Sequence, residues 1–266
     1  MRYLLLAILL MLPVCMSGQT YEELVGQAQT AVEHDSLEKA EALYKSALKL
    51  NPNDYRNALV YHNLGHVQEM MYWRNTNMKK MLEEAVYNYS KAIEMQPESV
   101  PMRFSRANLN LNMKSFGKAI LDYSAIIDKD KTNTTALNRR AYSYFQMRDY
   151  DKARTDYERV LEINPTDYTS ALGIALVLQK SNKSREAISR LEFLIAAYPD
   201  NPELYVVRSS MYEDLNMREM AILDLSKAIE MQPDNPEYYI QRAMVYEKMG
   251  KKALAKRDYR KASRLQ

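Results

Sequence analysis

Two histidines of this sequence stand at a spacing that metal-binding helices use. His62 and His66 are four residues apart, and Glu69 follows three residues later. On a helix these side chains would share one face, and imidazole and carboxylate groups are common zinc ligands. The H-E-x-x-H signature of zinc proteases is not met, because Asn63 occupies the place of the general-base glutamate. We therefore interpret the histidines as polar groups that line a groove, and a metal protein or enzyme built on them is the alternative.

Other motifs that carry chemistry are missing from the chain. The sequence contains no phosphate-binding G-x-x-x-x-G-K-[ST] loop, no dinucleotide-binding G-x-G-x-x-G and no G-x-S-x-G nucleophile elbow. Its 37 Lys and Arg residues nearly balance its 34 Asp and Glu residues, whereas general nucleic-acid binders are strongly basic. The sequence thus predicts no catalytic residue, no cofactor, no metal site and no nucleic-acid partner.

The elements that must position any functional group follow a repeat, because one alanine recurs every 34 residues. The recurring alanines are Ala85, Ala119, Ala153, Ala187, Ala221 and Ala255. The large apolar residues four places later are Tyr89, Tyr123, Tyr157, Leu191, Leu225 and Tyr259. Most copies end in proline, at Pro97, Pro165, Pro199 and Pro233, with Lys131 as the exception. A small residue lets two helices approach closely, and proline ends a helix, so the period predicts a repeated pair of antiparallel helices.

A 34-residue period with small residues at fixed places and a terminal proline resembles the tetratricopeptide repeat, a helix–turn–helix unit. The resemblance implies an all-α, right-handed α-solenoid that binds proteins or peptides and is not an enzyme. We expect about seven units, at 21–54, 58–99, 100–133, 134–167, 168–201, 202–235 and 236–266. Each unit buries its apolar face only against its neighbours. We therefore expect fourteen helices, no strand, and one solenoid over residues 19–266.

The second unit is longer than the others. Twenty residues separate Gly65 from Ala85, where most units have twelve between the equivalent residues, and the insertion contains the only tryptophan, Trp73. We expect an extended first helix, a longer turn and an unusually long second helix from Met78 to Gln96. Insertions in solenoids often project from one face, so Trp73 either covers the lengthened helices or contacts a partner.

Two charged columns follow the same period. The first helices carry Arg106, Arg140, Arg208 and Arg242, and the second helices carry Asp122, Asp156, Asp224 and Asp258. Unit 168–201 lacks both, because Ile174 and Arg190 occupy these positions. This joint loss predicts that each arginine pairs with the aspartate of its own unit, and the alternative is two unrelated solvated columns.

A binding surface is expected on the first helices, where residues at i, i+4 and i+7 share a face that the solenoid turns to its concave side. The segment from Ala171 to Leu178 is apolar all round, whereas a helix with one solvated face should be amphipathic. The candidate partner-binding residues are Phe104, Asn138, Tyr142, Phe145, Leu172, Leu176, Val206, Ser210 and Ile240. Alternatively, neighbouring first helices bury these side chains against one another.

The N-terminus is typical of a targeting segment. Arg2 precedes an apolar run from Leu4 to Leu12, which is too short to span a bilayer and fits a secretory signal. We expect a signal peptide over residues 1–18, with cleavage after Gly18, and a periplasmic or secreted protein. The function predicted on this basis is a non-enzymatic protein–protein interaction scaffold of the bacterial cell envelope, which holds a peptide or protein partner in its concave groove.

Cys15 allows a second interpretation of the same segment, as the lipidated first residue of an outer-membrane lipoprotein. Pro13 and Val14 depart from the small residues that normally precede such a cysteine. In this alternative the protein is a lipid-anchored component of an envelope assembly or secretion complex. The oligomeric state is left open by the sequence.

Apart from a lipid anchor, the sequence offers one route to a membrane surface. Outside the N-terminal segment, no stretch of the sequence is long and apolar enough for a membrane span. Four cations stand four apart in the last predicted helix, at Lys252, Lys256, Arg260 and Arg264. They either contact an anionic membrane peripherally or solvate the face on which no further unit packs.

Overall fold

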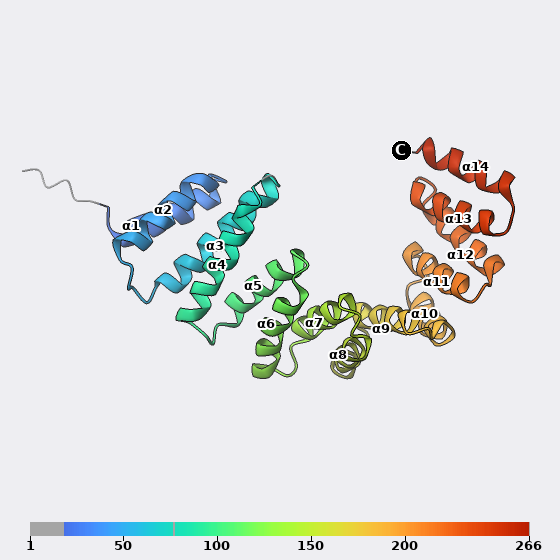
Figure 1. Cartoon of the computed structure of the whole chain (residues 1–266), viewed down its shortest axis with the longest axis horizontal. Coiled ribbons are helices and arrows are strands. Elements are labelled where there is room, and N and C mark those ends of the chain that lie inside the picture. The colour runs from blue at the N-terminus through green and yellow to red at the C-terminus, as the bar shows by residue number, and fades with distance from the viewer. Residues whose placement is uncertain (1–18, 77, 266) are drawn as a thin grey trace, which may run out of the picture. The chain divides into compact units, whose positions relative to one another are not determined.

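Fourteen α-helices alternate along residues 19–76 and 78–265, the part of the chain that the computed structural model describes (Figure 1). The first seven are α1 (Tyr21–Glu33), α2 (Leu37–Leu50), α3 (Asn57–Arg74), α4 (Lys80–Met95), α5 (Val100–Asn112), α6 (Phe116–Lys129) and α7 (Thr134–Gln146). The other seven are α8 (Tyr150–Ile163), α9 (Tyr168–Lys180), α10 (Ser184–Ala197), α11 (Pro202–Asp214), α12 (Arg218–Met231), α13 (Pro236–Lys248) and α14 (Lys252–Ser263). None of the described residues lies in a strand. The predicted all-α fold is therefore confirmed, while the predicted leader 1–18 and Cys15 lie outside the described residues.

The helices fall into two compact units, one that ends at Met102 and one that begins at Arg103. Consecutive helices pack on each other, such as α1 on α2 in the N-terminal unit and α13 on α14 in the C-terminal unit. First helices of neighbouring repeats also touch directly, as α7 touches α9. Within each unit, neighbouring repeats therefore bury apolar surface against each other.

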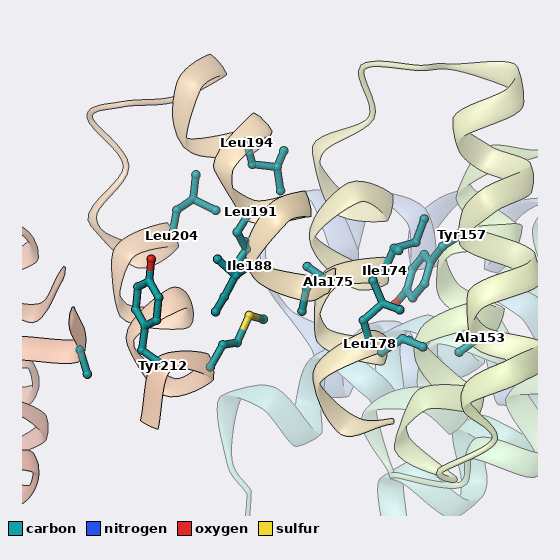
Figure 2. Packing of buried hydrophobic residues seen from close by; sticks show 14 of the residues in the cluster. Ala153, Tyr157, Ile174, Ala175, Leu178, Ile188, Leu191, Leu194, Leu204 and Tyr212 are labelled. Carbon is teal, nitrogen blue, oxygen red and sulfur yellow. The ribbon is translucent and has the colours of Figure 1, made fainter. Parts of the chain in front are cut away.

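The recurring alanines are buried, as expected where the two helices of a repeat pack closely. Ala85, Ala119, Ala153, Ala187 and Ala221 are fully buried, and Ala255 is nearly so. The large residues that follow fill the groove beside them: Figure 2 shows Tyr157 and Leu191 in the core of the C-terminal unit. This packing is what the 34-residue period predicted.

Glycine takes part in the same packing at Gly173 of α9. A Cβ atom at this position would lie 2.6 Å from ring atoms of Tyr157, which is closer than nonbonded carbon atoms approach. The absence of a side chain at Gly173 therefore lets the buried Tyr157 ring lie against the α9 backbone.

The lengthened second repeat forms the long helices that its insertion predicted. α3 has 18 residues and α4 has 16, whereas the other described helices have 12 to 14. α4 begins at Lys80 and ends at Met95, slightly inside the range expected from the sequence. Trp73 stands near the end of α3, about half exposed, and its ring centroid lies 5.0 Å from that of Tyr72.

The turn inside most repeats depends on one residue with a left-handed backbone. The residues in this conformation are Asp35, Lys114, Arg148, Asn182, Asn216 and Gly250, with φ between 57° and 72°. Only glycine and, less often, asparagine or aspartate adopt it at little cost. Since the last five recur at the step of 34 residues, this position is a turn signal that the alanine pattern did not reveal.

Candidate interaction surface on the first helices

The predicted Arg–Asp pairs form, each within its own repeat. In all four, the arginine Nε and Nη2 donate to the two oxygens of one carboxylate at 2.7–3.0 Å. The pairs are Arg106–Asp122, Arg140–Asp156, Arg208–Asp224 and Arg242–Asp258. No arginine of this set reaches the aspartate of the preceding repeat within the described hydrogen bonds. The pairing within each unit, predicted because unit 168–201 lacks both the arginine and the aspartate, is confirmed.

These pairs are mostly shielded from water. The aspartate side chains are 3–8% exposed and the arginine side chains 16–24%. The hydrogen bonds that Arg140 donates to Asp156 raise the pKa of its guanidinium. Because desolvation offsets much of the attraction between buried charges, their main effect is to fix how the two helices of a repeat align.

Arg140 and Arg242 each make a third hydrogen bond, which the sequence analysis did not predict. Arg140 Nη1 donates to Ser124 Oγ at 3.0 Å, and Arg242 Nη1 donates to Ser226 Oγ at 2.8 Å. Each serine lies on the second helix of the preceding repeat, so the arginine ties two repeats together. The signal was available, because both serines precede their arginine by the same 16 residues.

The nine candidate partner-binding residues all lie on first helices. They are Phe104 on α5; Asn138, Tyr142 and Phe145 on α7; Leu172 and Leu176 on α9; Val206 and Ser210 on α11; and Ile240 on α13. We call this set the first-helix face. Tyr142 is 45% exposed, and the other eight are half-buried.

The apolar members of the first-helix face on α7, α9 and α11 divide into two groups. Phe145, Leu172 and Val206 pack against the buried core of the C-terminal unit. Tyr142 and Leu176 do not belong to that core, as far as the described residues show. Phe145, Leu172 and Val206 thus have a packing role, whereas Tyr142 and Leu176 offer apolar atoms outside the core.

The polar members of the first-helix face connect consecutive repeats. Asn138 accepts a hydrogen bond from Ser170 Oγ at 2.7 Å and donates to Asp167, the N-cap of α9, at 3.3 Å. Ser210 accepts a hydrogen bond from Gln179 Nε2 at 3.1 Å. These contacts hold neighbouring first helices side by side, so Asn138 and Ser210 already have structural partners.

The histidines of α3 have aromatic and polar surroundings. The His62 ring lies 5.5 Å from that of Tyr89, and burial lowers the pKa of His62. Glu69 accepts hydrogen bonds from the Tyr89 hydroxyl at 3.1 Å and from Trp73 Nε1 at 3.4 Å. No group of three or more His, Cys, Asp or Glu side chains placed to hold a metal ion occurs within residues 19–76 and 78–265. Within the same ranges, no helix has the length and apolar character needed to cross a bilayer.

Family models place tetratricopeptide repeats at three positions in the C-terminal unit, which are residues 135–167, 202–235 and 225–257. The first two ranges coincide with the units expected at 134–167 and 202–235. The third joins the second helix of one unit to the first helix of the next. No curated protein matches the chain.

Solved structures resemble between 63% and 93% of the chain. A tetratricopeptide repeat protein from Parabacteroides merdae ATCC 43184 is 25% identical, with a TM-score of 0.74 over 93% of this chain and 94% of that one. YrrB, described as a TPR protein with an unusual peptide-binding site, is 19% identical, with a TM-score of 0.56 over 78% of this chain and 97% of its own. MamA from Desulfovibrio magneticus RS-1 is 19% identical, with a TM-score of 0.56 over 63% of this chain and 95% of its own.

The comparisons agree with the geometry described above. YrrB and MamA show a likeness of fold alone, while the family models and the Parabacteroides protein share the repeat itself. Folds of this kind generally act as non-enzymatic scaffolds that bind other proteins. Tetratricopeptide repeats are therefore detected at residues 135–167 and 202–257, and the all-α fold of the described residues matches an α-solenoid of such repeats.

Proposed function

We propose that this protein is a non-enzymatic scaffold of the bacterial cell envelope, and that it holds a peptide or protein partner along the concave groove lined by the first-helix face. The observation that carries the proposal is the position of Tyr142 and Leu176, which present apolar surface outside the core. Contiguous apolar surface that remains accessible commonly marks an interaction site. The peptide-binding site ascribed to YrrB, which shares the fold, supports the same assignment.

The pattern of α9 strengthens this argument. Gly173, Ile174, Val177 and Leu178 are buried, which accounts for one side of the helix. Leu176 lies on another side, half-buried, where a solvated helix would carry a polar residue. An apolar side chain at this place stabilises the protein less than it would stabilise a complex that covers it.

Two substitutions test the groove. Leu176→Ser and Tyr142→Ala, separately and together, should lower recovery of the native partner in a quantitative pull-down, while the melting temperature stays unchanged. Leu223→Ser is the matched control, because Leu223 is a large apolar residue that is 62% exposed on a second helix, α12. Lost stability with unchanged binding would assign Leu176 and Tyr142 to packing and contradict the proposal.

The envelope location has a separate test. Mass spectrometry of the mature N-terminus should find Gln19, free or cyclised, if residues 1–18 are removed as a secretory signal. A diacylated Cys15 would instead support the alternative, a lipid-anchored component of an envelope assembly or secretion complex. An N-terminus that begins at Met1 would contradict both.

A further inference from the structure

Unit 168–201 departs from its neighbours at three positions that line one cavity. Ala171 stands where the other repeats of this region carry Leu137, Tyr205 and Tyr239. Ile174 and Arg190 stand where those repeats carry the Arg–Asp pair. All three line a cavity of about 320 Å³ between the end of α8 and helices α9 and α10. The cavity therefore exists because this repeat lacks the side chains that fill the space elsewhere.

The next two repeats show what occupies the equivalent space. Tyr205 fills the position of Ala171 one repeat later, and its hydroxyl donates to the carbonyl oxygen of Pro199 at 3.1 Å. Tyr239 occupies this position two repeats later, and its hydroxyl donates to the carbonyl oxygen of Pro233 at 3.1 Å. The equivalent proline here is Pro165, which lines the cavity. Ala171 has no hydroxyl group that could donate a hydrogen bond to the Pro165 carbonyl oxygen.

The walls of the cavity are mostly apolar, and Arg190 is the one cation among the lining residues. Leu161, Leu194 and Tyr198 contribute apolar surface, and Phe193 is 76% exposed at the rim. Figure 2 shows Ile174 of α9 beside Tyr157 of α8, and Leu194 on α10. Arg190 forms no ion pair with any described residue, because the aspartate column is replaced at this point by the arginine itself. A ligand that combines an aromatic ring with a nearby carboxylate would place its ring against the apolar walls and its negative charge near Arg190.

We propose that this cavity binds a tyrosine side chain of a partner protein, with an aspartate or glutamate beside that tyrosine facing Arg190. The tyrosine would repeat the contact that Tyr205 and Tyr239 make within the chain, including the hydrogen bond from its hydroxyl to the Pro165 carbonyl. An apolar cavity of roughly 150 Å³ is enough to hold a benzene ring, so about 320 Å³ admits a phenol. The site lies apart from Tyr142 and Leu176, and its test does not depend on the groove.

A capped peptide with Tyr-Asp at its centre is the probe, added to the full chain carrying labelled isoleucine and leucine methyl groups. Saturable NMR shifts at Ile174 and Leu194 are expected. A peptide with Ala in place of Tyr should weaken binding by about tenfold or more. A peptide with Asn in place of Asp, and separately Arg190→Gln, should each weaken it by about two- to fivefold, as for an exposed ion pair.

Filling the cavity from within gives the decisive comparison. Ala171→Tyr copies Tyr205, and Ala171→Leu copies Leu137, so two variants with different side chains close the same space. Each should keep the wild-type melting temperature or raise it, and each should lose the peptide-induced shifts. Thr169→Tyr, which adds a tyrosine at an exposed position of the same helix, should bind like wild type. Leu176→Ser should also bind like wild type, which separates this site from the groove.

Three results would overturn the proposal. One is the absence of saturable shifts in the wild-type chain. Another is peptide binding that persists unchanged in an Ala171→Tyr or Ala171→Leu variant that is folded. The third is equal binding of the Tyr and Ala peptides.

Discussion

Each Arg–Asp pair removes two charged groups from water and returns two hydrogen bonds between the helices of one repeat. Such a pair adds little net stability, but the loss of one partner leaves the other buried without compensation. The sequence revealed these pairs because one repeat lacks both the arginine and the aspartate, and carries Ile174 and Arg190 in their places. It did not reveal Ser124 and Ser226, since a serine column is easily taken for solvated surface.

Removal of one charged partner should therefore lower the free energy of unfolding far more than replacement of both partners. Arg140→Ala leaves Asp156 buried and is expected to lower the free energy of unfolding by about 3 kcal/mol. The double variant Arg140→Ile with Asp156→Arg copies the natural Ile174 and Arg190 combination and should recover most of that loss. Urea unfolding of the intact chain measures both, and equal losses in the single and double variants would contradict the structural role of the pair.

His62 gives the N-terminal unit a dependence on pH. Burial and the nearby His66 lower the pKa of His62 in the folded protein, so the unfolded chain binds a proton more readily. The free energy of unfolding should then be highest above the ordinary histidine pKa of about 6.5 and fall as the pH is lowered through it. Urea unfolding between about pH 7.5 and 5.5 should show this fall in the wild type and a smaller one in His62→Gln. An equal fall in both would assign the effect to other groups.

Two features of the helices decide how the repeats pack. The first is the step of 34 residues, which places alanine wherever the paired helices meet, and it was readable from the sequence. The second is the local exception, such as Gly173 against Tyr157. This exception could not be predicted, because its cause is a neighbouring side chain that no single column records.

Gly173→Ala tests the close contact. Alanine is favoured over glycine within a helix by about 1 kcal/mol, but the new Cβ would meet the buried Tyr157 ring at 2.6 Å. We expect the contact to outweigh the helix preference, so that the melting temperature falls. In the Tyr157→Leu background the same substitution should become neutral or stabilising, and a fall of equal size there would show that the ring is not the cause.

For the whole molecule, the repeated pattern predicted the fold, while the departures from it indicate function. The fourteen helices, the ion pairs and the long second repeat all follow from spacing in the sequence. The cavity beside Ala171 could not be foreseen in the same way, because it is a space left by an absent side chain. Unit 168–201 holds both this cavity and Leu176, so it is where binding is expected to concentrate.

Site-specific photo-crosslinking in cells tests the central claim of a partner on the first-helix face. A photoreactive phenylalanine analogue at position 142 should give one dominant crosslinked product, identified by mass spectrometry and reduced by Leu176→Ser. The same analogue at position 223, on the exposed side of α12, should not give that product. Crosslinking only at position 223, or equal yields of the same product at both positions, would contradict the assignment of the partner to the first-helix face.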